Sequence, residues 1–233
     1  IAAPADELTA LAPRRSRRAE SAAPADACGL ADLLALIKQH DAAGYLQAMQ
    51  QRLARQGLQR FVQDTVAPLT RQVGEAWEDG SFEVFEEHLF TELTKRLLRQ
   101  TIAALPSGPR GPRVLLTSVP DEPHILGLLM VEALLALEGA ECIPLGTQMP
   151  LLEIGRAAAA HRADIVGLSF SIAFPQRQIP GLLQQLRQIL PTTVELWAGG
   201  GGIQRAPQME GVLTLDTFDA AITALADWRA NHS

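Results

Sequence analysis

The sequence has few cysteines, few aromatic residues and no long hydrophobic run. Its two cysteines, Cys28 and Cys142, form no CxxC pair and have no metal-ligand spacing, which argues against a disulfide framework and a zinc site. No apolar run reaches the roughly 20 residues that cross a bilayer. The start of the chain lacks the charged-then-apolar order of a signal peptide. We therefore expect a cytoplasmic protein with no membrane partner.

Positive charge is scarce as well. The chain has 20 Lys and Arg against 26 Asp and Glu, for a formal net charge of -6. Nucleic acids select a basic face, so this composition argues against a chain that binds DNA by itself. The sequence begins with Ile1 and not with Met. We expect any contact with DNA to come from a domain before this residue, absent from the sequence.

Composition divides the 233 residues into three parts, which we interpret as three domains or segments. Residues 1–28 are rich in Ala and Pro and have no apolar period, as is typical of a linker. Over residues 29–108 the apolar residues recur at helical spacing, which predicts a bundle of four antiparallel helices. These helices are expected over 30–40, over 44–56, over 59–77 with a kink at Pro68, and from the turn at Gly80 to Leu105.

From residue 112 to residue 233 short apolar runs alternate with amphipathic stretches. This alternation is typical of a parallel sheet whose strands are connected by helices. The predicted fold class is therefore α/β with an all-α cap: a four-helix bundle followed by a Rossmann-like, doubly wound domain of five strands and five helices. The strands are expected over 113–118, 141–145, 164–170, 194–198 and 211–213.

The loop after the first strand holds a histidine with a carboxylate two residues before it, His124 and Glu122. Ligands of doubly wound sheets bind at the carboxyl ends of the strands. A carboxylate that accepts one ring N–H fixes the tautomer and makes the other nitrogen a stronger metal ligand. A surface histidine beside acids gives the same pattern, so the residues alone leave both interpretations open.

Two further strand ends offer a small hydroxyl and bare backbone. The third strand ends in Ser169-Phe170-Ser171, and the fourth is followed by glycines from Gly199 to Gly202. Glycine lets a ligand approach the main chain closely, although a flexible turn gives the same sequence. No GxGxxG follows the first strand, which disfavours a nicotinamide cofactor.

Together these strand-end motifs, Glu-x-His-x-x-Gly, Ser-x-Ser and Gly-Gly, resemble the corrinoid-binding domain shared by methionine synthase, cobalamin mutases and corrinoid photoreceptors. The resemblance covers about residues 113–228. It implies that His124 is the lower axial ligand of cobalt and that Glu122 is its hydrogen-bond partner. It also implies cofactor contacts around a buried dimethylbenzimidazole tail at Gly127, Ser169, Ser171, Gly199 and Gly200.

The motifs depart from the corrinoid pattern at three places. Glu122 replaces the usual Asp, and Ser171 replaces the usual Leu of Ser-x-Leu. The Gly-Lys-Asn that often follows the histidine in methyl carriers is Gly127-Leu128-Leu129 here. The last departure weakens the resemblance to methyl carriers.

The helical segment carries a second motif, in which Trp77 is followed after nine residues by Glu87-His88. This spacing resembles the adenosylcobalamin-dependent photoreceptor regulators of the CarH/LitR type. The resemblance implies that Trp77, Glu87 and His88 surround the adenosyl group. Aromatic faces suit adenine, and a carboxylate accepts hydrogen bonds from sugar hydroxyls. A core Trp beside a solvated Glu-His pair is the alternative.

One departure within this motif bears on mechanism. Several of these photoreceptors carry a histidine directly after the tryptophan, and it ligates cobalt from above once light has expelled the adenosyl group. Glu78 occupies that position here. A two-histidine photoproduct built that way is therefore not expected.

The resemblance as a whole implies the light-sensing part of a MerR-family transcriptional regulator, without catalytic turnover. Adenosylcobalamin would lie between cap and sheet domain, and light would change the cap position and a dimeric or tetrameric homo-oligomer. An N-terminal helix-turn-helix, absent from this sequence, would bind DNA. Two alternatives stay open: a corrinoid methyl-carrier protein of a methyltransferase system, and a sheet domain that no longer binds cobalamin.

Overall fold

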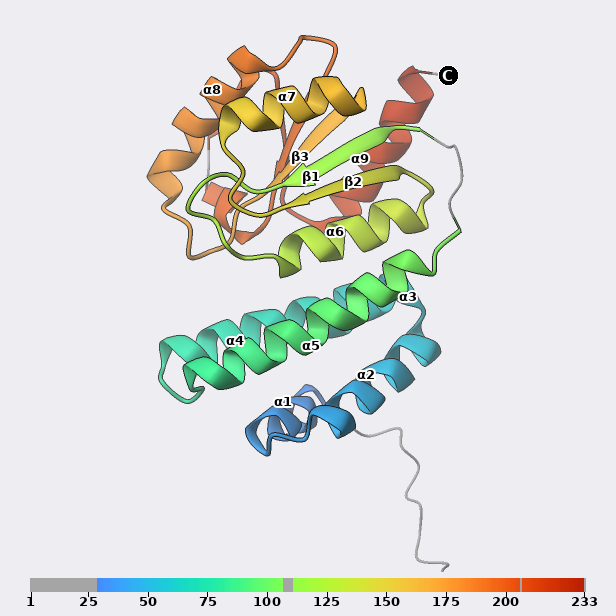
Figure 1. Ribbon diagram of the computed structural model, residues 1–233, viewed down its shortest axis with the longest axis vertical. Helices are drawn as coiled ribbons and strands as arrows, with labels where there is room; N and C mark the ends of the chain where they lie inside the picture. The colour runs from blue at the N-terminus through green and yellow to red at the C-terminus, as the bar shows by residue number, and fades with distance from the viewer. Residues whose placement is uncertain (1–28, 107–110, 206, 233) are drawn as a thin grey trace, which may run out of the picture.

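The computed structural model describes residues 29–106, 111–205 and 207–232. A helical cap precedes an α/β domain, so the predicted fold class is confirmed (Figure 1). The segment predicted as a linker, residues 1–28, lies outside the described residues. Within the described ranges, no helix is both long enough and apolar enough to cross a bilayer.

The cap contains the four predicted helices, the third of them divided. Pro68 has no N–H to donate and its ring clashes with the carbonyl four residues back. The turn just before it widens into the π-helix η1, so the predicted irregularity at Pro68 lies one turn earlier. The elements of the cap are α1 (Leu30–Lys38), α2 (Ala42–Gln56), α3 (Leu58–Arg60), η1 (Phe61–Val66), α4 (Ala67–Glu78) and α5 (Val84–Ala103).

The second domain has one sheet of five parallel strands in the order β2-β1-β3-β4-β5. The chain goes from β1 outward to β2 and then returns to the other side of β1 to form β3. The carboxyl ends of β1 and β3 therefore flank the switch point, where ligands of open parallel sheets bind. The strands are β1 (Arg113–Thr117), β2 (Glu141–Gly146), β3 (Ile165–Ser169), β4 (Glu195–Gly199) and β5 (Val212–Leu215).

Helices cover both faces of the sheet. One face carries α7 (Leu151–His161) and α8 (Ile179–Ile189), preceded by the short η2 (Gln176–Gln178). The opposite face carries α6 (Leu126–Leu137) and α9 (Phe218–Asn231) (Figure 1).

The prediction of five helices in this domain is wrong between β4 and β5. The described residues there form only the short 3-10 helix η3 (Gly201–Arg205). Gly200 has φ of 95°, outside the α-helical region, and further glycines follow it. Glycine is a poor helix former and Pro207 ends the segment soon after, so an α-helix has no room to form.

The cap packs on the outer side of α6. This helix, LGLLMVEALLAL, is apolar almost all the way round, as expected for a helix buried on two sides. Leu128 and Leu135 pack toward the sheet, whereas Leu126, Leu129 and Met130 belong to the core of the cap. The helix α6 therefore contributes to the apolar cores of both domains and lies between them (Figure 1).

Candidate functional site

The loop from β1 to α6 is fastened to the end of the neighbouring strand. The Ser118 hydroxyl donates to the carbonyl of Glu122 at 2.5 Å and accepts from the amide of Gln148 at 2.9 Å. The Met149 amide donates to the carbonyl of Ser118 at 2.9 Å. Asp121 has φ of 67°, a left-handed conformation that Asp tolerates better than most residues. These contacts fix the turn that presents Glu122 and His124.

His124 and Glu122 form the hydrogen-bonded pair that their spacing in the sequence predicts. Nδ1 of His124 lies 2.6 Å from Oε1 of Glu122, and the His124 amide donates to the same oxygen at 3.1 Å. The Glu122 side chain is 1% exposed and the His124 side chain 54% exposed. The other carboxylate oxygen accepts from the amide of Ser171 at 2.7 Å. A buried carboxylate thus holds an imidazole whose outer edge faces solvent.

The hydrogen bonds decide the charge of this pair. Burial raises the pKa of Glu122, but hydrogen bonds from His124 and from the Ser171 amide outweigh burial and lower it overall. The pKa of His124 is raised mainly by its hydrogen bond to Glu122, against the opposing effect of burial. Glu122 therefore remains ionised, and its charge favours a proton on Nδ1 of His124.

Gly127 and Ser169 come together at the switch point. A Cβ on Gly127 would lie 2.7 Å from Oγ of Ser169, so this position of α6 has no room for a side chain. The Ser171 hydroxyl is buried beside the Glu122 carboxylate and lowers its pKa. The Ser171 hydroxyl therefore lies close to Glu122, and the Ser169 hydroxyl lies close to Gly127.

The glycines after β4 interlock with the chain after β3. A Cβ on Gly200 would lie 2.3 Å from the carbonyl oxygen of Phe170, and the φ of Gly200 is 95°. On Gly199 a Cβ would lie 3.1 Å from the carbonyl oxygen of Leu215. The protein's own backbone thus accounts for these glycines, and their predicted contact with a cofactor tail stays a prediction.

The residues predicted to surround the adenosyl group lie at the end of α4 and the start of α5. They are Trp77, Glu87 and His88. Trp77 is 52% exposed, so it is not the core tryptophan of the alternative interpretation. Glu87 accepts from the Thr91 hydroxyl at 2.8 Å and lies 2.9 Å from Nδ1 of His88. Glu78 is exposed beside Trp77. An indole and an oriented carboxylate therefore face outward at this end of the cap.

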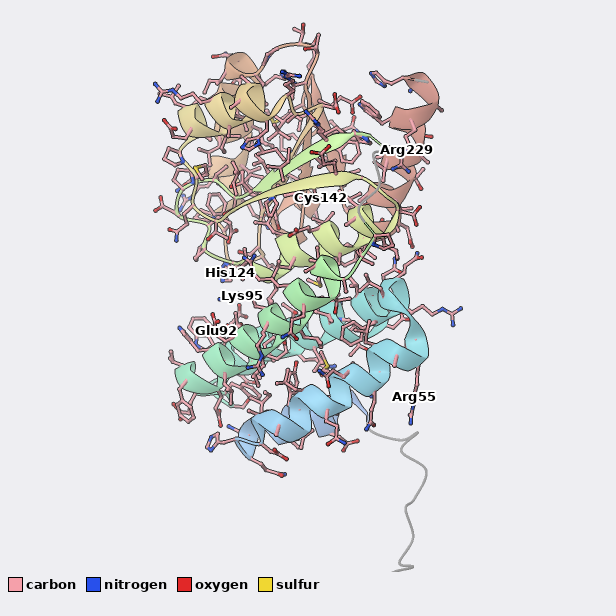
Figure 2. All side chains as sticks on the ribbon, turned by 45° about the vertical axis from the view of Figure 1, so that its right-hand side comes forward. Arg55, Glu92, Lys95, His124, Cys142 and Arg229 are labelled. Atoms are coloured by element: carbon pink, nitrogen blue, oxygen red, sulfur yellow. The ribbon has the colours of Figure 1, made fainter. Side chains whose placement is uncertain are left out.

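This end of the cap lies on the same side of the molecule as the β1–α6 loop. The negative charge of Glu87 raises the pKa of His124, so the two side chains are within electrostatic reach. Figure 2 shows His124 at the end of the α/β domain nearest to α5, on the side of Glu92 and Lys95. The structure thus brings together the motifs of the two domains. Their residues Glu87 and His124 stand 37 positions apart in the sequence.

The arrangement fits a metal whose ligands are mostly supplied by a cofactor and not by the protein. Nε2 of His124 makes no hydrogen bond to any residue in the described ranges, and Nδ1 is held by Glu122. Among the described residues no group of three or more His, Cys, Asp or Glu could hold a bare metal ion. A corrinoid needs one axial nitrogen from the protein, which Nε2 of His124 can supply.

Sequence reasoning missed Ser118, whose hydroxyl joins Glu122 in the β1–α6 loop to Gln148 in the loop after β2. Its position directly after a buried strand is the only sequence signal. Serine hydroxyls at strand ends commonly bond local backbone groups, so this signal indicates a turn and not a ligand.

Comparison with known proteins gives a family for each domain. Residues 30–101 and residues 112–225 each match a family model described as a B12 binding domain. Over 137 residues the chain is 36% identical to the HTH-type transcriptional repressor CarH of Myxococcus xanthus, a match that covers 59% of this chain and 46% of the repressor. The match therefore spans about half the length of that curated relative.

A solved structure shares the fold of both domains. The monomethylamine corrinoid protein of Methanosarcina barkeri superposes with a TM-score of 0.64 and 18% sequence identity, over 84% of this chain and 96% of that chain. Residues 30–101 and residues 112–225 therefore each form a B12 binding domain, and the chain is a cobalamin-binding module similar to part of the CarH repressor.

Proposed function

We propose that this module senses light through adenosylcobalamin and regulates transcription. The observation that carries the proposal is the position of His124. Its Nδ1 is held by a buried Glu122, its side chain is exposed, and the negative charge of Glu87 in the cap acts on it.

On the lower face, His124 would be the axial ligand of cobalt. Glu122 keeps Nδ1 protonated, so Nε2 presents its lone pair, and the Ser171 amide keeps the carboxylate from turning away. The tail of the cofactor would enter near Gly127, Ser169, Ser171, Gly199 and Gly200.

On the upper face, Trp77 would stack on the adenosyl group and Glu87 would accept from its sugar hydroxyls. Trp77 is available for this contact, because the residue is 52% exposed. The Thr91 hydroxyl donates to the Glu87 carboxylate and so holds it in place, which reduces the entropy lost on binding.

When bound, the cofactor would supply a cobalt–carbon bond that light cleaves. Loss of the adenosyl group would remove the contacts of Trp77 and Glu87 and so change the preferred position of the cap. The change in the cap would alter the homo-oligomer and, in a cytoplasmic regulator, DNA binding by a MerR-type domain outside this chain. The proposal includes no catalytic turnover.

The test is an absorption spectrum of the protein reconstituted with adenosylcobalamin in the dark, recorded before and after green light. Size-exclusion chromatography with light scattering is run on both samples. We expect a bound corrin, a spectral change on illumination and a change in mass. Binding of methylcobalamin but not adenosylcobalamin would overturn the proposal in favour of a methyl carrier, and no binding of any cobalamin would overturn the assignment of the site.

A further inference from the structure

The turn between α4 and α5 is fastened by a side chain from another helix of the cap. Lys38, the last residue of α1, donates from Nζ to the carbonyl of Ser81 at 2.7 Å and to Oε2 of Glu86 at 2.8 Å. The same ammonium lies 5.1 Å from the centre of the Phe82 ring. One side chain of α1 thus contacts both the turn itself and the first turn of α5.

Glu86 is the most buried member of this group, with a side chain that is 5% exposed. Its Oε2 also accepts from the amide of Glu83, the N-cap residue of α5, at 2.8 Å. His40 lies farther away, with Nε2 3.8 Å from Oε1 of Glu86. A buried carboxylate is costly unless it is paired and hydrogen-bonded. The residue that caps α5 therefore depends mainly on Lys38 for its opposite charge.

Glu87 follows Glu86 directly and shares the same helical turn. Its amide donates to the carbonyl of Glu83 at 3.1 Å, and its carboxylate accepts from Thr91 at 2.8 Å. The negative charge of Glu87 raises the pKa of His124, which places this turn within electrostatic reach of the candidate cobalt ligand. Any shift of the first turn of α5 would therefore move the Glu87 carboxylate relative to the site.

We infer that Lys38 is a positioning residue for the upper face of the cofactor site. It holds Ser81 and Glu86, and through them it fixes the turn of α5 from which Glu87 reaches the sugar hydroxyls of an adenosyl group. Lys38 itself does not contact the cofactor. The inference rests on the proposed function, because it takes Glu87 to be a residue that binds the adenosyl group.

The test replaces Lys38 by methionine, which removes the charge but keeps an unbranched side chain, and measures the Kd for adenosylcobalamin and for methylcobalamin in the dark. We expect the Kd for adenosylcobalamin to rise about tenfold, the lower end of what loss of a hydrogen bond to a charged group costs. The Kd for methylcobalamin should change less than about twofold, because a methyl group has no hydroxyl for Glu87 to bind. Lys38→Arg keeps a charged donor and should restore most of the affinity.

Two further measurements separate positioning from folding of the cap. Tyr45→Phe removes the buried hydrogen bond of 2.8 Å between Tyr45 and Thr94, inside the cap but away from the α4–α5 turn. This control should lower the Tm of the apoprotein and leave the ratio of the two Kd values unchanged. In a Glu87→Gln background, Lys38→Met should have little further effect on the Kd for adenosylcobalamin, because the carboxylate through which Lys38 acts is gone.

Glu86→Gln removes the buried charge together with the ion pair, so it is expected to keep the cap folded even if Lys38→Met does not. It should shift the ratio of the two Kd values in the same direction. An unchanged ratio in the folded variants would overturn the inference, and so would an equal effect of Lys38→Met with and without the Glu87 carboxylate. If the unmodified protein binds methylcobalamin but not adenosylcobalamin, the proposed function fails and the inference fails with it.

Discussion

Oε1 of Glu122 lies 2.6 Å from Nδ1 of His124, and the two side chains differ sharply in exposure, at 1% and 54%. The buried Glu122 orients the imidazole, and the exposed His124 can bind a metal. Glutamate is longer than the aspartate usual in corrinoid domains. Here its extra reach lets Oε2 accept from the Ser171 amide after β3, so the pair ties together both strands at the switch point.

Glu122→Gln tests this orienting role. Glutamine keeps the size of the side chain but has no charge to favour a protonated Nδ1. Loss of such a carboxylate typically costs about 10- to 100-fold in metal affinity, and we expect a comparable rise in the Kd for adenosylcobalamin. Titration followed by absorbance measures the Kd and shows whether histidine coordination is lost. Asp121→Asn is the control, because it removes an exposed charge from the same loop; an equal effect of both changes would argue for a general charge effect.

Glu78→His tests the departure beside Trp77. Glu78 is exposed at the end of α4, so a histidine is tolerated there without repacking of the core. In illuminated samples we expect the spectrum of cobalt with two nitrogen axial ligands from the variant and not from the unmodified protein. Glu75→His, exposed on the same helix, should leave the photoproduct unchanged. A two-histidine spectrum from the unmodified protein would show that another histidine, such as His88, takes this role.

Glu132→Gln tests the interface between the domains. Glu132 lies in α6 and is 7% exposed. Burial raises its pKa, against the opposing charge of Arg99 on α5. A carboxyl with a raised pKa in the folded state is favoured while protonated, so its contribution is present below its unfolded pKa and lost as pH rises through its folded pKa. The variant should therefore be more stable than the unmodified protein at pH 8.

Urea unfolding of the apoprotein at pH 5 and at pH 8 measures this difference, which should shrink at the lower pH. Glu138→Gln is the control, since Glu138 is exposed just beyond the end of α6. A difference between variant and unmodified protein that grows as pH falls would contradict the assignment of a raised pKa to Glu132.

The sequence was sufficient to predict features that depend on neighbouring residues. The helical periods and the apolar strand runs are local patterns, and so is the spacing that allows Glu122 to reach His124. The short η3 depends on the glycines after β4. These glycines are visible in the sequence, but the prediction of a fifth helix did not allow for their effect on helix formation. The widening of the third helix into η1 before Pro68 is a response to the backbone clash, which periodicity does not report.

Other features depend on how the domains meet. From the sequence we expected α6 only as a helix between two strands, and the structure shows that one side of it belongs to the core of the cap. The exposure of Trp77 could not be predicted, because it borders the buried side of α4 and either outcome fits the helical period. The nearness of Glu87 to His124 follows from that same docking of the cap.

Trp77→Ala separates binding from folding. Trp77 is 52% exposed, and surface substitutions usually change stability by no more than about 0.5 kcal/mol, so the apoprotein should keep its Tm. Trp197 is the contrast, since it is 3% exposed and its Nε1 donates to Glu195 at 2.8 Å. Trp197→Ala should destabilise the apoprotein by about 3–5 kcal/mol.

Trp77 is instead expected to contribute to the binding of the cofactor. A ligand that binds only the folded state raises stability in proportion to its affinity, so adenosylcobalamin should raise the Tm of the unmodified protein and raise it less in Trp77→Ala. With methylcobalamin the two should rise alike, because a methyl group does not reach the indole. Thermal unfolding of apo and reconstituted samples in the dark measures both shifts. An equal rise with adenosylcobalamin would mean that the indole does not contact the adenosyl group, and the upper face of the site would then have to be assigned to other residues of the cap.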